Sequence, residues 1–161
     1  MSTREHFIAV FKDELPRFVR VLKAVPADKA SYKPHERSQS AADLVSLLAN
    51  ELHDATVLLA KGEVAFVPKP APPDLATSIQ AYEKNAAAVK RGLAKVKDAA
   101  WKKKARFLAD GKVVWEAPLG DMLWGFLFDA IHHRGQLSTY LRPMGAKVPS
   151  IYGPSADDPG M

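Results

Sequence analysis

Apolar residues recur at the spacing of an α-helix in four separate stretches of this 161-residue chain. Spacings that alternate between three and four residues place an apolar stripe along each helix, and such a stripe has to be buried against other helices. The pattern therefore predicts an all-α fold, a four-helix bundle that forms a single domain over residues 1–161. The predicted helices cover about residues 3–24, 40–62, 75–97 and 120–142.

The segments between these helices are too long for the short turns of a simple up-and-down bundle, which favours a topology with crossover connections. Asp110-Gly111 separates two short apolar runs before the last helix, so we expect a small β-hairpin there. Four prolines between Pro68 and Pro73 predict a stiff, extended connection after the second helix. Residues 143–161 contain several prolines and glycines and should form a C-terminal coil.

Local signals mark where the helices begin. Ser40 and Asp43 are spaced as a capping box at the start of the second helix, and Asp74 can cap the third. Pro16 lies inside the pattern of the first helix and should kink or divide it, because proline lacks the backbone donor and clashes with the preceding turn.

The composition narrows the chemistry that is available. The chain has no cysteine, so a metal ion would have to be bound by imidazole, carboxylate or water. No apolar run approaches the roughly 18 residues that a membrane span requires, and the N-terminus lacks the layout of a signal peptide. We therefore expect a cytoplasmic protein with no membrane partner.

The net charge of +5 is concentrated in one segment. Eight of the 23 basic residues lie between Lys90 and Arg106, where Asp98 is the only acid. Part of this segment ends a predicted helix, where cations interact favourably with the helix dipole. No zinc finger, RNA-recognition motif or helix-turn-helix pattern accompanies the charge, so nucleic-acid binding is not predicted.

Ionisable residues interrupt the apolar pattern of the last helix in residues 127–137. Asp129 and His133 are four residues apart and fall within the stripe that should meet the other helices. Burying both is costly unless they pair with each other or bind a metal ion, and the spacing fits either alternative. Arg134 and Gln136 flank this pair.

A metal ion would need a third ligand from another helix. The second helix carries Glu51 on the flank of its apolar stripe and His53 at a position rotated much further toward solvent. The chemistry of imidazole favours His53, whereas geometry favours Glu51, and we give geometry more weight. The sequence therefore predicts His133, Asp129 and Glu51 as metal ligands, with His53 as the alternative to Glu51.

Several longer strings point to a known family. Residues 132–137 read His-His-Arg-Gly-Gln-Leu, and further characteristic segments are residues 32–35, 38–44, 140–142, 145–149 and 150–154. Together they resemble the DinB/YfiT-like family of metal-dependent enzymes, which is distinct from the DNA polymerase of similar name. The resemblance covers almost the whole chain, and its most specific element is the His-Arg-Gly-Gln string. It implies that Arg134 and Gln136 serve packing and hydrogen bonding and are not catalytic.

The resemblance implies a four-helix bundle, often dimeric, with a divalent metal ion, commonly nickel or zinc, held by three histidines. One histidine belongs to the second helix, and two are spaced by four on the last. His133 matches the final ligand, Asp129 replaces the histidine four residues earlier, and Leu47, which cannot bind metal, occupies the position on the second helix. Glu51 lies one turn later and could substitute. One imidazole and two carboxylates would shift the preference toward manganese, iron or zinc.

The resemblance also suggests a function. Characterised members include thiol-dependent transferases and a mycothiol-dependent isomerase, which implies a metal-dependent transferase, hydrolase or isomerase acting on a small molecule such as a low-molecular-weight thiol. The alternative is a non-enzymatic homodimer or small-ligand binder in which Asp129 and His133 form a structural pair without metal. The sequence shows no nucleophile with a base beside it and no phosphate or dinucleotide motif, so no catalytic residue and no organic cofactor is predicted.

Overall fold

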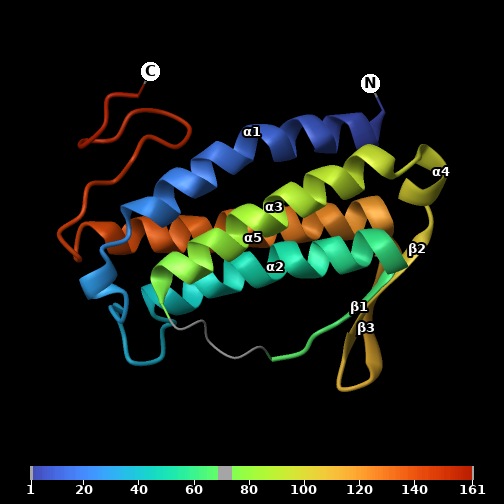
Figure 1. The fold of residues 1–161 in the computed structure, drawn as a ribbon, viewed down its shortest axis with the longest axis horizontal. Helices are drawn as coiled ribbons and strands as arrows, with labels where there is room; N and C mark the ends of the chain where they lie inside the picture. The colour runs from blue at the N-terminus through green and yellow to red at the C-terminus, as the bar shows by residue number, and fades with distance from the viewer. Residues whose placement is uncertain (1, 69–73, 161) are drawn as a thin grey trace.

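The computed structural model describes residues 2–68 and 74–160, in which five helices accompany a small three-stranded sheet (Figure 1). The helices are α1 (Thr3–Ala24), α2 (Ala41–Lys61), α3 (Leu75–Lys95), α4 (Asp98–Trp101) and α5 (Leu119–Leu141). The strands are β1 (Glu63–Ala65), β2 (Lys104–Ala109) and β3 (Lys112–Pro118), and a short 3₁₀ helix covers Ala27–Lys29. Most of the predicted proline-rich connection lies outside the described residues.

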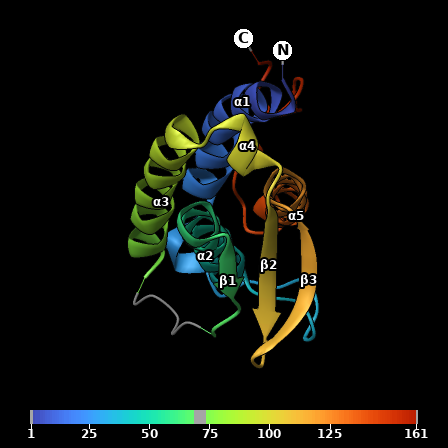
Figure 2. The ribbon, with the colours of Figure 1, turned by 90° about the vertical axis from the view of Figure 1, so that its right-hand side faces the viewer.

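The four long helices occupy the predicted positions and surround one apolar core. The main packing partners of α1 are α3 and α5, and α2 packs against the same two helices. Figure 2, which looks along the helices, shows the resulting order α1, α3, α2, α5 around the core. The connection from α1 to α2 therefore passes from one side of this group to the other, which explains why the sequence between them is long.

The predicted helix caps are confirmed. The backbone N–H of Asp43 donates to the Ser40 hydroxyl at 3.1 Å, and the Ser40 N–H donates to the Asp43 carboxylate at 3.0 Å. Asp74 accepts a hydrogen bond from the Thr77 N–H at 2.6 Å. These bonds satisfy donors that the first turn of a helix leaves unpaired, so they fix where α2 and α3 begin.

Of the two outcomes predicted at Pro16, a kink or a division of the first helix, the division does not occur, since α1 continues through this residue. Pro16 and Lys12 both face solvent, so water can reach the carbonyl that loses its helical donor. The next carbonyl, that of Asp13, accepts a hydrogen bond from the Arg17 side chain at 2.8 Å. The missing backbone N–H of Pro16 therefore destabilises α1 less than it would if this turn of the helix were buried in the core.

The predicted hairpin is present as β2 and β3, which pair antiparallel. Its turn residues Asp110 and Gly111 both have positive φ angles, 50° and 74°, as the tight turns of hairpins require. The sequence did not predict β1, which pairs in parallel with β2 and makes the sheet mixed. The all-α expectation is thus correct for most of the chain and incomplete here.

A second unpredicted element, α4, places Trp101 beneath the start of α5. Trp101 is buried, and its ring lies against Gly120, where an added Cβ would come within 2.3 Å of the indole. Residue 120 therefore has to be glycine for this contact to form. Residues 143–160 contain no helix or strand, in agreement with the predicted coil. Within the described part of the chain, no helix is sufficiently long and apolar to cross a membrane.

Candidate metal centre

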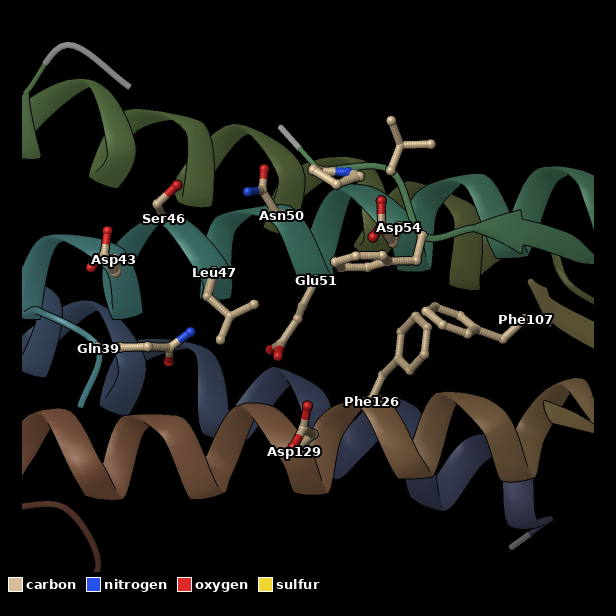
Figure 3. Close-up of a pocket in the computed structure, with 13 residues that line it drawn as sticks. Gln39, Asp43, Ser46, Leu47, Asn50, Glu51, Asp54, Phe107, Phe126 and Asp129 are labelled. Atoms are coloured by element: carbon tan, nitrogen blue, oxygen red, sulfur yellow. The ribbon is translucent and has the colours of Figure 1, made fainter. Parts of the chain in front are cut away.

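Three of the predicted ligand residues come together between α2 and α5. Glu51 extends from α2, while Asp129 and His133 extend from successive turns of α5, and one ligand atom from each lies within 4.8 Å of the others. His133 Nε2 is 3.8 Å from Glu51 Oε1 and 3.5 Å from Asp129 Oδ2. In Figure 3 the carboxyl groups of Glu51 and Asp129 point toward each other across the space between the helices.

These groups differ in their access to solvent. The side chains of Glu51 and His133 are 15% and 17% exposed, whereas that of Asp129 is 62% exposed. The expectation that Asp129 belongs to the buried stripe of the last helix is therefore wrong. Asp129 lies at the edge of the stripe, beside a cavity between α2 and α5. The cluster combines two enclosed groups with one that solvent can reach.

Glu51 is the member of the cluster whose burial is hardest to explain without a ligand. Both of its carboxyl oxygens are buried, and neither makes a hydrogen bond of standard geometry with the described residues. Burial raises the pKa of Glu51 to about 9, and the neighbouring Asp129 carboxylate adds to the effect through its negative charge and through a side-chain contact with the protonated acid. In the absence of a cation, Glu51 is therefore protonated at neutral pH.

A hydrogen bond to Gln136 fixes the orientation of the His133 ring. His133 Nδ1 lies 2.8 Å from Gln136 Oε1, and an amide oxygen can only accept, so Nδ1 is the protonated ring nitrogen. The lone pair of Nε2 then points toward Glu51 and Asp129. This is the tautomer that a metal ligand requires, held by the kind of outer hydrogen bond that orients histidine ligands.

The distances in the cluster suit a first-row divalent ion. Two ligands at about 2.1 Å from a tetrahedral ion are separated by about 3.4 Å. The 3.5 Å and 3.8 Å separations from His133 Nε2 are close to this value. The three residues therefore fit a metal ion without large movement, and a mixed imidazole and carboxylate set is chemically suitable for manganese, iron or zinc.

The other two positions considered on α2 lie outside this cluster. The His53 side chain is 52% exposed and contacts Asp54, with its Nδ1 3.1 Å from Asp54 Oδ1. Leu47 lines the same cavity as Glu51, one turn earlier on the helix (Figure 3). The structure thus places Glu51, and not His53, next to His133, while Leu47 contributes an apolar surface.

The cavity next to the cluster has a volume of about 390 Å³, within the range of small-molecule sites. Most of its walls could not be predicted from the sequence, because they come from four separate parts of the chain. Phe126 lies on the last helix, and nothing in the sequence joins it to Phe66 and Phe107. The lining residues are Gln39, Asp43, Ser46, Leu47, Asn50, Glu51, Asp54, Phe66, Val67, Pro68, Phe107, Phe126 and Asp129.

Arg134 faces away from this cavity and has the packing role that the family resemblance implied. It is 1% exposed and donates hydrogen bonds to Glu14 at 2.5 Å and to the Tyr152 hydroxyl at 2.6 Å. Its guanidinium also lies 4.5 Å from the centre of the Phe18 ring. The Glu14 carboxylate offsets the buried charge, so this group joins α1, α5 and the C-terminal coil.

Known proteins share this fold. A sequence model of the DinB family matches residues 1–160. A DinB-like protein from Bacillus subtilis aligns over 91% of this chain and 97% of its own, with 19% identity and a TM-score of 0.72. One from Bacillus cereus aligns over 92% and 97%, with 18% identity and a TM-score of 0.76.

A third solved structure is the mycothiol-dependent maleylpyruvate isomerase, with 13% identity and a TM-score of 0.58. The match covers 92% of this chain but 63% of the isomerase. No curated protein is significantly similar in sequence. At these identities the structural likeness concerns the fold alone.

Proposed function

Because the family match covers residues 1–160, this chain belongs to the DinB family, and we propose that it is a metalloprotein that binds one divalent ion between α2 and α5. Glu51, Asp129 and His133 are the proposed ligands. The observation that carries the proposal is the state of Glu51, whose buried oxygens make no hydrogen bond of standard geometry with the described residues and lie beside an oriented imidazole. A cation at this point would satisfy both groups.

The remaining residues of the site have separate roles in this proposal. Gln136 holds the His133 ring with Nε2 toward the ion, and Leu47 and Phe126 line the cavity on either side of Glu51 (Figure 3). The cavity leaves room for a further ligand next to Asp129. When bound, a divalent ion supplies a Lewis acid that lowers the pKa of a coordinated water or thiol. The donor set favours manganese, iron or zinc over the nickel common in the family.

For the reaction, we propose a thiol-dependent group transfer or isomerisation. Hydrolysis at the same metal site is a further option. The support is the shared fold with a mycothiol-dependent isomerase, together with a cavity large enough for a small substrate. Leu47 favours the alternative of a non-enzymatic ligand-binding protein, because it puts a methyl-bearing side chain where the family has a histidine. The metal content of the purified protein distinguishes the metal-dependent enzyme from the alternative, a metal-free ligand-binding protein.

The proposal is tested by purifying the protein without a histidine tag and measuring bound metals by mass spectrometry. We expect close to one divalent ion per chain in the wild type, and loss of that ion in His133→Ala and Glu51→Gln variants. His53→Ala is the matched control, since His53 lies outside the cluster, and it should keep its metal. Protein that is metal-free and gains no thermal stability from added zinc, manganese or iron would contradict the proposal.

A further inference from the structure

A groove with a positively charged lining lies at the end of the molecule where α2 and α3 both finish and α4 follows (Figure 1). Its volume is about 710 Å³, and its described lining shares no residue with the proposed metal centre or with the cavity beside it. Half-buried apolar residues form the floor, where α2 and α3 approach closely, since a Cβ added to Gly92 would lie 3.1 Å from Leu59 Cδ1. We call it the basic groove after the four cations in its lining, Arg91, Lys95, Lys97 and Lys103.

These four cations have no negatively charged partner in the described part of the chain. All four are exposed, and none makes a salt bridge or a side-chain hydrogen bond with another described residue. None of the described lining residues of the basic groove is aspartate or glutamate. The fold therefore brings four uncompensated positive charges around one apolar floor.

Two acids beside this segment are paired with other cations. Asp98 pairs with Arg4 at 2.6 Å, and Glu116 pairs with Lys104 at 2.7 Å and with Arg106 at 3.1 Å. The C-terminal ends of α2 and α3 contribute about half a negative charge each, which offsets only part of the four positive charges. The basic groove therefore has a positive potential, which attracts anions.

From this charge and the apolar floor together we propose that the basic groove binds a small organic phosphate, with its apolar part on the floor and its phosphate group among the four cations. Arginine binds phosphate oxygens in pairs, and lysine adds point charges. The volume lies within the range of small-molecule sites. The described lining has no aromatic side chain on which a nucleic-acid base could stack, which favours a small anion over a single-stranded nucleic acid.

2-Naphthyl phosphate is a suitable probe, because it combines an apolar ring system with a dianionic group. Its binding to the full chain is compared with that of 2-naphthol, which lacks the charge, and of inorganic phosphate, which lacks the apolar part. The ligand-observed NMR titrations are made on metal-free protein, since phosphate also coordinates divalent ions. We expect the ester to bind about tenfold more tightly than either fragment, and added salt to weaken its binding severalfold.

A double charge reversal tests whether the ester binds in the basic groove. Lys97→Glu combined with Lys103→Glu should weaken its binding about tenfold or more, since both positions line the groove. Lys84→Glu combined with Lys112→Glu changes the net charge equally at exposed positions outside the lining, and should weaken binding less than about twofold. Circular dichroism confirms that both double variants are folded.

The α2 side of the basic groove carries none of the four cations, so it is tested separately. Ala60→Glu places a carboxylate on that side and should weaken binding of the ester severalfold. Ala87→Glu places the same charge at an exposed position of α3 outside the lining and should have little effect.

Equal affinities for the ester and 2-naphthol, or wild-type affinity in the folded variant with Lys97→Glu and Lys103→Glu, would overturn the inference. So would tighter binding of a short single-stranded DNA than of the ester, which would assign the groove to nucleic acid. The inference goes beyond the proposed function and does not depend on it. A protein that binds no metal ion can still bind the ester, and the converse also holds, so the two proposals fail separately.

Discussion

His133 and Glu51 face each other from different helices, with Nε2 of the imidazole 3.8 Å from Oε1 of the carboxyl group. This separation is too long for a hydrogen bond, so the two groups are neighbours without satisfying each other. The other nitrogen of His133 is occupied by Gln136, and the oxygens of Glu51 make no hydrogen bond of standard geometry with the described residues. Two enclosed polar groups oriented toward a common point are typical of a binding centre, since a purely structural pair would close to hydrogen-bond distance.

A histidine at residue 47, where the family resemblance implies one, should strengthen the proposed site. Leu47 lines the cavity one turn before Glu51, so Leu47→His places a second imidazole near His133. We expect the affinity for nickel and zinc to rise by about tenfold or more, because imidazole is a better ligand than carboxylate for these ions. Isothermal titration calorimetry measures the change. Ala60→His, on an exposed part of α2, is the control, and an equal gain there would show that the effect does not come from the site.

The stability of the metal-free protein should fall as the pH rises from about 4.5 to about 9. The pKa of Glu51 is raised from its ordinary value of 4.5 to about 9, so between these values the folded state holds a proton that the unfolded state has lost. The stabilisation is complete below pH 4.5 and decreases by up to about 1.4 kcal/mol per pH unit above it. Urea unfolding in the presence of a chelator measures this slope.

Glu51→Gln should flatten that pH dependence, because the amide keeps the shape of the protonated acid and does not titrate. Glu36→Gln, at an exposed position, should leave the slope as in the wild type. Zinc binding at pH 7 should also release about one proton from Glu51, which calorimetry in buffers of different ionisation enthalpy detects. A wild-type slope that persists in Glu51→Gln would place the titrating group elsewhere.

Gln136 should matter for metal affinity although it is not itself a ligand. Its side chain fixes the tautomer and the ring orientation of His133 through the 2.8 Å bond to Nδ1. Removing such a partner usually lowers metal affinity by about 10- to 100-fold, so we expect a loss in this range for Gln136→Ala. Ser138→Ala, which removes a hydroxyl that donates to the Gly135 carbonyl, serves as the control in the same zinc titration. Equal affinities in the two variants would mean that His133 needs no orienting bond.

Removing Arg134 should destabilise the fold far more than a surface substitution does. Arg134→Met removes the buried partner of Glu14, which keeps its contacts with Arg17 at 3.1 Å and with the Tyr152 hydroxyl at 3.0 Å. We therefore expect a loss near the lower end of the roughly 3 to 5 kcal/mol that breaking a buried ion pair costs. The double variant Arg134→Met with Glu14→Leu removes both charges and should recover much of the loss. Urea unfolding measures the three proteins. A double variant no more stable than Arg134→Met would show that the charge of Glu14 is not the cause.

The expected homodimer can be tested at an exposed aromatic residue of α5. Phe128 is 61% exposed, and its ring stacks on Trp124 at 5.5 Å. Exposed aromatic side chains of this size are common at protein interfaces. We predict a dimer by light scattering for the wild type and a monomer for Phe128→Glu. A wild type that is monomeric at all concentrations would contradict the prediction, and a variant that stays dimeric would place the interface elsewhere.

Helix positions could be predicted because local rules determine them. An apolar stripe specifies which face of each helix is buried, and the caps at Ser40 and Asp74 specify where two of them begin. The same periodicity explains why Glu51, Asp129 and His133 could be proposed together from the sequence. Residues four apart on α5 must share a face, and the flank of α2 must meet it.

The features that could not be predicted depend on packing between distant segments. Glu14 is buried because its partner Arg134, 120 residues later, is buried with it, and no local pattern reports such a pair. Asp129 is exposed because the packing of α5 leaves a cavity beside it. The strand β1 and the helix α4 have three and four residues, too few to show a periodicity.

The parallel pairing of β1 has a consequence for motion at the cavity. The N–H of Phe66, just after the strand, donates to the Leu108 carbonyl at 2.7 Å, which ties one aromatic wall to the hairpin. Moving Phe66 outward by itself breaks this bond, so the cavity opens on this side only when Phe66 separates from the hairpin. The hydrogen-exchange rate of the Phe66 amide therefore reports how often the cavity widens. Slower exchange at this amide would indicate that a ligand has bound in the cavity.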